Sequence, residues 1–320
     1  MHSAIISALA LAFVIASALG LDCSRSVQVI SLAILVALLG VPHGALDHVA
    51  GQRLLRPAFG SFWGVAFFSV YLTVSVFVVI GWYVMPAATI LTFFLVSAWH
   101  FGLEERDGES SGWLRHLLAI ASGGMIIWMP ALFRGDEVAE LLTIITPSEL
   151  DKTIALCVSA TATSAVILGP LWLWDCIRKD RQTSRPERGW LHFICASNSV
   201  RMLSLAVCCS FVNPLSAFAV YFCGWHSARG LHQLARSFGE PVLATYHRLM
   251  PLTLAALALV AAGSLIWGSS EVFETSLIRT IFLGLSAMAV PHLCLHVVAG
   301  SFYRPCTNRS AAHGEVFNHA

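Results

Sequence analysis

Histidines recur in the apolar segments of this chain, where an ionisable ring is not expected. The chain has 13 histidines although 57% of its residues are hydrophobic. Several lie in short motifs within or at the edge of apolar runs: PHGALDH at 42–48, SAWHFG at 97–102, WHSARG at 225–230 and PHLCLH at 291–296. An ionisable side chain is costly in hydrocarbon, so its repeated placement at helix depth indicates a site. Because imidazole is the commonest metal ligand in proteins, the sequence predicts a metal centre embedded in a membrane.

One histidine from each motif is a candidate metal ligand: His43, His100, His226 and His292. Two acids stand four residues after such a histidine and are its neighbours on a helix, Asp47 after His43 and Glu104 after His100. We treat both acids as candidate catalytic residues, because a carboxylate that accepts the second ring proton fixes which nitrogen faces a metal. The competing interpretation is that each motif is a helix end whose polar residues and tryptophan meet the lipid headgroups.

The other polar residues of these runs have simpler explanations. His296 lies four residues after His292, but an HxxxH pair alone is a weak metal signal. His232 is expected to face the interface, and Arg229 to extend its guanidinium to the membrane surface. Interfacial polarity also explains the remaining internal histidines, which are His48, His116, His192 and His247.

Arg201 lies with Asn198 inside an apolar run and needs partners there. It either closes a polar network or substrate path, or binds a backbone carbonyl of a neighbouring helix. The nine cysteines contain no CxxC pair, and most lie in apolar runs. They are expected to act as small apolar core residues and not as metal ligands.

Composition places the chain among polytopic membrane proteins, with 12% charged residues and a mean hydropathy of +0.74. A net charge of +1 gives no electrostatic basis for binding nucleic acid. The apolar runs lack the alternation of barrel strands, so we predict an all-α fold, a polytopic transmembrane helical bundle of about 8–10 spans. We expect the chain to form a single integral membrane domain, 1–320, that ends in a short tail at 301–320. The ten candidate spans lie at about 4–21, 27–45, 62–84, 88–103, 113–133, 153–174, 190–211, 214–235, 250–268 and 278–299. Segment 137–146 is too short to span and is expected to lie at the interface.

The basic loop at 178–188 sets the predicted orientation. The positive-inside rule places this loop in the cytoplasm, and counting spans then places both termini in the cytoplasm of a protein that crosses the cell membrane several times. The first apolar segment has no preceding positive charge, so we expect it to be a retained span and not a cleaved signal peptide. The same count brings all four candidate ligands into one leaflet, as a shared metal requires.

The donor set indicates the metal and its substrate. Imidazoles without a thiolate repeat suit Fe(II) among redox-active metals, and zinc also fits them. Open coordination positions would allow O2 to bind. The surrounding phenylalanine, tryptophan, leucine and methionine residues imply an apolar substrate that arrives laterally from the lipid bilayer.

Taken together and in this order, the four motifs resemble the Brp/Blh family of bacterial and archaeal membrane β-carotene 15,15'-dioxygenases. The resemblance rests on PHGALDH, SAWHFG, WHSARG and the late Pro291-His292, and runs across most of the chain. It implies an all-helical membrane enzyme that cleaves the central double bond of the carotenoid with O2 to give two retinals at a non-haem iron. His43, His100 and His226 match the iron ligands of the family.

The chain departs from the family pattern at one position. The pattern is His-Ser-x-Arg-His, and here its final position is Gly230, which has no side chain to bind metal. Either His292 completes the ligand set, or the site has three ligands, or the activity has changed, in that order of preference. On the first interpretation, a histidine introduced at position 230 is expected to restore part of the iron binding of a His292 variant.

Two other classes of function compete with this interpretation. A membrane di-iron hydroxylase or desaturase needs more histidines, usually in HxxHH clusters, and the sequence contains no such cluster. A transporter or metal permease would line a path through both leaflets with polar residues. The gathering of the histidines in one leaflet favours a pocket that ends within the membrane.

Overall fold

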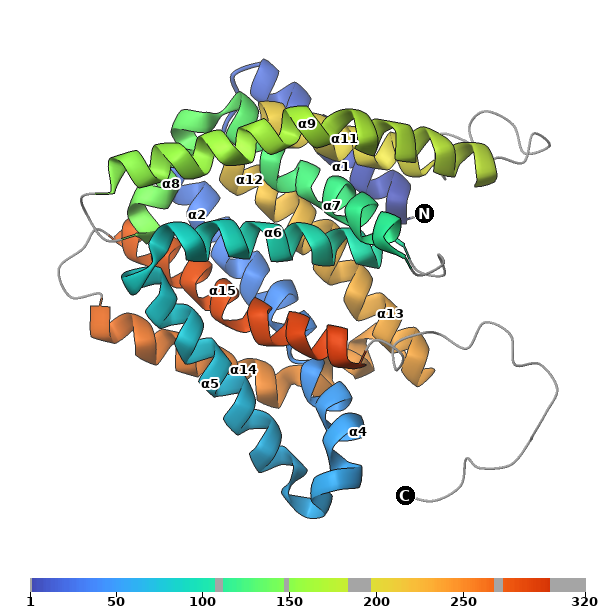
Figure 1. Ribbon diagram of the computed structural model, residues 1–320, viewed down its shortest axis with the longest axis vertical. Coiled ribbons are helices and arrows are strands. Elements are labelled where there is room, and N and C mark those ends of the chain that lie inside the picture. Colours follow the sequence, from blue (N-terminus) through green and yellow to red (C-terminus); the bar gives the residue numbers. More distant parts are fainter. Residues whose placement is uncertain (1, 107–111, 147–149, 184–196, 268–272, 300–320) are drawn as a thin grey trace.

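The computed structural model describes residues 2–106, 112–146, 150–183, 197–267 and 273–299. All regular structure in these ranges is helical, which confirms the predicted all-α class (Figure 1). The helices are α1 (His2–Ala18), α2 (Arg25–Leu35), η1 (Val36–Gly40), α3 (Val41–Gly44), α4 (Asp47–Phe59), η2 (Gly60–Phe62), α5 (Trp63–Val84), α6 (Pro86–Glu104), α7 (Trp113–Phe133), α8 (Gly135–Ile145), α9 (Asp151–Thr183), α11 (Asn198–Phe211), α12 (Pro214–Phe218), η4 (Ala219–Ser227), α13 (Ala228–Phe238), α14 (Val242–Trp267) and α15 (Phe273–Ala299). The predicted tail at 301–320 lies outside the described residues.

Six helical segments of the described chain are long and apolar enough to cross a membrane: Arg25–Val84, Pro86–Glu104, Trp113–Phe133, Asp151–Arg181, Val242–Ala262 and Phe273–Leu295. The first contains two predicted spans, 27–45 and 62–84, with α4 between them. Three other predicted spans do not meet this measure. The helix α1 has only 17 residues. Of the predicted span 190–211, residues 190–196 lie outside the described residues, and the described part forms the 14-residue α11. The segment 214–235 is divided among α12, η4 and α13.

Large apolar side chains cover the outer faces of the long helices. Val65 and Phe77 of α5 and Ile167 of α9 are each 68% exposed. Exposing such a continuous apolar surface to water is energetically unfavourable, whereas contact with lipid tails is not. Helices also satisfy their own backbone hydrogen bonds in hydrocarbon. The bundle is therefore that of a membrane protein.

The helices α6 and α7 pack with their backbones in close contact. A Cβ added at Gly102 would lie 1.8 Å from the carbonyl oxygen of Ala119, so only glycine allows this approach. On its other sides α7 packs against α9 and α11 (Figure 1). Arg106, directly after α6, forms a buried ion pair with Asp175 of α9, which fixes the end of α6 that carries His100 and Glu104.

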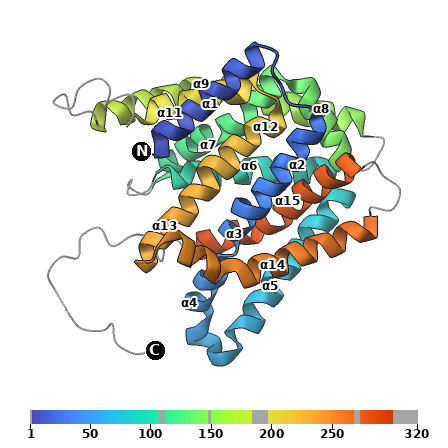
Figure 2. The same cartoon turned by 180° about the vertical axis from the view of Figure 1, so that it is seen from behind.

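The second part of the bundle is built around α15, which packs against α5, α14, α2 and α8. The hairpin of α4 and α5 projects at the lower end of Figure 2. The segment expected at the interface, 137–146, largely forms α8, and its Leu142 and Ile145 are buried against the bundle.

Candidate metal centre

Four separate elements each contribute one of the predicted histidines to a single cluster. His43 lies in α3, His100 in α6, His226 in η4 and His292 in α15. All four are buried, with exposed fractions of 4–7%. The histidines that the sequence placed in one leaflet are therefore neighbours in the structure.

The four imidazoles form a closed ring of contacts. The ring centroids are 4.8 Å apart for His43 and His226, 5.3 Å for His226 and His100, 5.1 Å for His100 and His292, and 5.5 Å for His292 and His43. Each pair meets edge to face, at interplanar angles between 61° and 84°. No imidazole lies apart from the other three.

These separations fit four imidazoles around one ion. With a metal–nitrogen bond of about 2.1 Å, a ring centroid lies about 3.2 Å from the metal, and two rings at 90–120° then have centroids about 4.5–5.5 Å apart. All four observed separations lie within that interval. The four centroid separations are therefore compatible with imidazoles arranged around a single transition-metal ion.

Two π-helical segments position half of this cluster. The segment η1 ends just before Pro42-His43, and η4 contains His226 itself. A π-helix inserts an extra residue into each turn, which rotates the following side chains relative to a regular α-helix, and such segments are common at functional sites. The regular helix expected at 214–235 is therefore replaced around His226 by a local distortion.

Asp47 bonds to a different histidine from the one that the sequence predicted. The chain leaves the helix at Ala45 and Leu46, so Asp47 begins α4 and is no longer one turn from His43 on a continuous helix. Its Oδ1 lies 2.6 Å from Nδ1 of His292, and its Oδ2 accepts a hydrogen bond of 3.1 Å from the Tyr71 hydroxyl. Asp47 thus fixes the ring of His292, with Nε2 as the nitrogen left for a metal.

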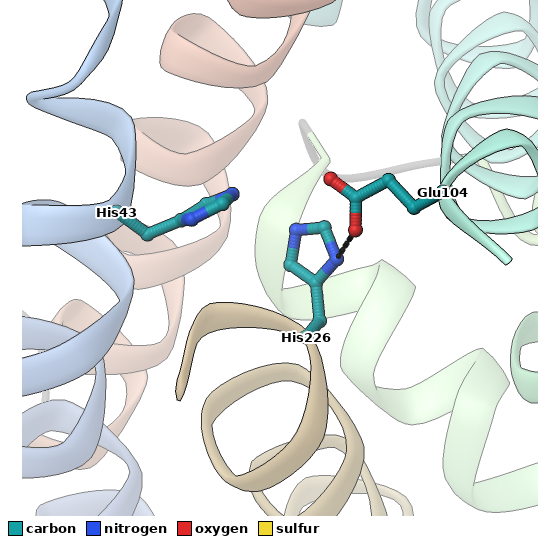
Figure 3. A group of neighbouring side chains, drawn as sticks. All are labelled: His43, Glu104 and His226. Atoms are coloured by element: carbon teal, nitrogen blue, oxygen red, sulfur yellow. Dashed lines mark ion pairs between the residues drawn. The ribbon is translucent and has the colours of Figure 1, made fainter. Parts of the chain in front are cut away.

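Glu104 contacts two of the histidines, one more than predicted. Its Oε2 lies 3.0 Å from Nδ1 of His226, and its Oε1 lies 3.5 Å from Nε2 of His100. Figure 3 shows Glu104, His226 and His43 facing a common space. One donor atom from each of these three residues lies within 4.8 Å of the other two, an arrangement that can hold a metal ion.

Glu105 forms a polar network that sequence reasoning missed. Its carboxylate pairs with Arg201 and Arg229 and accepts a hydrogen bond of 2.8 Å from Nε1 of Trp225. Arg201 also stacks 4.1 Å above the Trp225 ring and bonds to Asn198. The open question about Arg201 is settled in favour of a polar network, and Arg229 is not a simple snorkelling residue. The signal available in the sequence was an arginine in an apolar helix, which requires an acid nearby.

The remaining histidines of the described chain lie outside the cluster. His48 bonds to the carbonyl of Ala45 at 2.6 Å, and His116 accepts a hydrogen bond from Trp99. His232 and His247 are exposed. His192 and the side chain of His296 fall outside the described residues.

A long apolar pocket leads away from the histidines. Apart from the four histidines and Ser97, the side chains that line it are apolar or aromatic. On α6, η4 and α15, the histidine is the last or next-to-last lining residue, so the donors gather at one end. The lining of α15 begins at Phe282, ten residues before His292, which corresponds to about 15 Å of helix.

Gly230 lies directly against His43. A Cβ added at Gly230 would be 2.2 Å from both Nδ1 and Cε1 of that ring. The imidazole of His43 therefore occupies the space that a side chain at position 230 would need. This contact argues against the expectation that a histidine at position 230 would restore iron binding, because the new side chain would compete with His43 for the same space.

Comparisons with known proteins agree on one family. The sequence matches the family model described as Beta-carotene 15,15'-dioxygenase over residues 34–298, a range that includes all four clustered histidines. It is similar to a protein named Beta-carotene 15,15'-dioxygenase from the uncultured marine bacterium 66A03, with 27% identity over 285 residues, which are 86% of this chain and 94% of that protein. No solved structure matches the chain.

Proposed function

Because the chain belongs to the Beta-carotene 15,15'-dioxygenase family, we propose that it cleaves β-carotene with O2 at the central 15,15' double bond and releases two retinals. The observation that carries the proposal is the cluster of four imidazoles at one end of an apolar pocket. A hydrocarbon substrate needs such a pocket, and an oxygenase needs metal ligands where the pocket ends.

We assign Fe(II) to the cluster, with His43, His100, His226 and His292 as its ligands. When bound, Fe(II) supplies the site at which O2 is activated for reaction with a carbon–carbon double bond. The donor set supports iron or another borderline metal, since it contains imidazoles and a carboxylate and no thiolate. Asp47 holds the ring of His292, and Glu104 holds that of His226, so the protein fixes both tautomers before a metal binds.

The aromatic residues at the cluster hold the substrate and exclude water. Phe101 and Phe222 lie against His226, with ring centroids at 4.8 Å and 5.6 Å. A conjugated polyene is flat and apolar, and it packs well against such rings. In this arrangement one half of the symmetric carotenoid fills the pocket, so the depth of the pocket sets which double bond reaches the histidines.

A transporter remains the second candidate from sequence, and the pocket argues against it. A path for a polar solute needs polar lining along its length, whereas here the polar side chains in the described lining are the histidines and Ser97. We therefore place the protein in the cell membrane as an enzyme that takes its substrate from the lipid.

We also propose that both termini are cytoplasmic, on the basis of the basic residues at 178–188. A reporter fused after Arg188 is expected to be cytoplasmic, and one fused near Glu149 to be external. The reverse result would invert this orientation without affecting the histidine cluster.

The decisive experiment is expression in a bacterium that accumulates β-carotene. The cells are expected to lose colour and to form retinal, measured by chromatography, whereas cells carrying an empty vector or a His226→Ala variant keep their carotene. The purified protein is expected to contain one iron ion for each chain. Unchanged carotene together with an iron-free protein would refute the proposal.

A further inference from the structure

The carboxylate of Glu104 uses its two oxygens differently. Oε2 is 3.0 Å from Nδ1 of His226, which is an ordinary hydrogen-bond distance. Oε1 is 3.5 Å from Nε2 of His100, which is too long for a good hydrogen bond. The two contacts therefore call for different explanations.

The longer distance is the one expected between two ligands of the same ion. Two donor atoms that each lie about 2.1 Å from a metal, at an angle of 90–110°, are about 3.0–3.4 Å apart. The separation of 3.5 Å between Oε1 and the His100 nitrogen is close to this value. Figure 3 shows the oxygen that does not bond to His226 facing the same space as the rings of His226 and His43.

The surrounding charges give a second reason. The ionic contacts of Glu104 in the described chain are with the imidazoles of His226 and His100. The nearby guanidinium groups of Arg201 and Arg229 pair with Glu105 instead. A largely buried carboxylate is stabilised by a cation close by, and a carboxylate ligand offsets part of the charge of a divalent metal held among neutral imidazoles. The metal would supply the positive charge that stabilises Glu104, and Glu104 would supply negative charge to the metal.

We propose that Oε1 of Glu104 is itself a metal ligand, so that this chain holds its metal with a mixed imidazole and carboxylate set. The inference rests on the proposed iron centre and adds to it. Position 230, where the family pattern has a histidine, carries no donor here, and His43 lies over it. Glu104 provides an additional donor from the opposite side of the cluster, on α6.

The first test is the Glu104→Gln variant, which separates ligation from hydrogen bonding. The amide oxygen of glutamine can still accept the proton of His226 Nδ1, so a purely orienting role predicts iron affinity close to that of the wild type. Ligation predicts that the iron dissociation constant rises about 100-fold. That increase is at or above the largest effect expected when a residue that only hydrogen-bonds to a metal ligand is replaced. Competition with a coloured chelator measures the constant, and the unfolding temperature of the metal-free variant checks that the fold is intact.

The second test detects the ligand directly. In Glu104→Cys protein loaded with Co(II), a thiolate bound to cobalt gives an intense charge-transfer absorption band that imidazole and carboxylate ligands do not give. Ser97→Cys places a thiol in the same pocket about two helical turns from Glu104 and is expected to give no such band. Wild-type cobalt protein controls for the native cysteines.

The outcomes distinguish this inference from the proposed function. A wild-type protein that holds iron and forms retinal, together with wild-type iron affinity in Glu104→Gln, would overturn the ligand role of Glu104 alone. A wild-type protein that binds no iron would overturn the proposed centre as a whole. Weak iron binding in Glu104→Gln and the band in Glu104→Cys support direct ligation.

Discussion

Replacing Gly230 by alanine tests whether His43 depends on the missing side chain. The added Cβ would lie 2.2 Å from two atoms of the His43 ring, whereas ordinary contact begins at 3.4 Å, so the ring must move by at least 1.2 Å. Metal–ligand distances tolerate only about 0.2 Å of deviation. To accommodate the methyl group, the His43 ring would have to leave its present position in the cluster.

The expected loss is large in function and moderate in stability. A misplacement of about 1 Å at a reacting centre can cost about 100-fold in rate, so retinal formation by Gly230→Ala is expected to fall by that order. Inserting a methyl group into a packed site typically costs about 1–3 kcal/mol, so the variant is expected to fold. Iron content is expected to fall together with activity.

The assay is retinal formation and iron content of purified protein in detergent, with Gly169→Ala as the matched control. A Cβ at Gly169 meets nothing within 4 Å, so this variant should behave as the wild type. Gly230→His should be at least as inactive as Gly230→Ala. Wild-type iron content and turnover in Gly230→Ala would refute the placement of His43 against position 230.

Four further substitutions test other contacts of the structure. Asp47→Ala is expected to weaken iron binding about 10- to 100-fold, measured by chelator competition, because the ring of His292 loses its hydrogen-bond acceptor. Tyr71→Phe, which removes the hydroxyl that contacts Asp47 and the Met288 carbonyl, should cost only about 1 kcal/mol of unfolding free energy. His292→Ala is expected to lose iron nearly as completely as a variant of His226, whereas an exposed histidine such as His232 should be replaceable without loss; the opposite pattern would exclude His292 from the set. Gly102→Ala should lower the thermal unfolding temperature, since its Cβ would meet backbone that cannot move aside; an unchanged temperature would contradict the close approach of α6 and α7.

The sequence predicted those features that follow from hydropathy and charge. The span expected at 113–133 coincides with α7, and the span expected at 88–103 is α6 at 86–104. Apolar runs have clear ends because charged residues are excluded from hydrocarbon, so the boundaries can be read locally. The gathering of the histidines could be anticipated because span direction and residue position together fix depth.

Contacts that depend on local departures from regular helix could not be read in the same way. The pairing of Asp47 with His43 assumed a continuous helix, and the turn at Ala45 and Leu46 removes it. Nothing in the residue types marks η4 as π-helical, so the orientation of His226 was also open. Whether a helix narrows, widens or turns for one residue depends on tertiary packing, which periodicity does not encode.

The adjacent acids Glu104 and Glu105 at the end of α6 have different neighbours and different roles at this site. Consecutive residues of a helix point about 100° apart, so Glu104 and Glu105 cannot face the same neighbours. Glu105 is held by Arg201, Arg229 and the Trp225 indole, next to His226 in the chain. These contacts of Glu105 fix the rotation of the end of α6 about its axis, so the side chain of Glu104 faces the histidines. The arginine pair, of which Arg201 is buried and therefore costly by itself in a membrane, is thereby explained as the means by which the carboxylate of Glu104 is kept beside the histidines of the proposed metal centre.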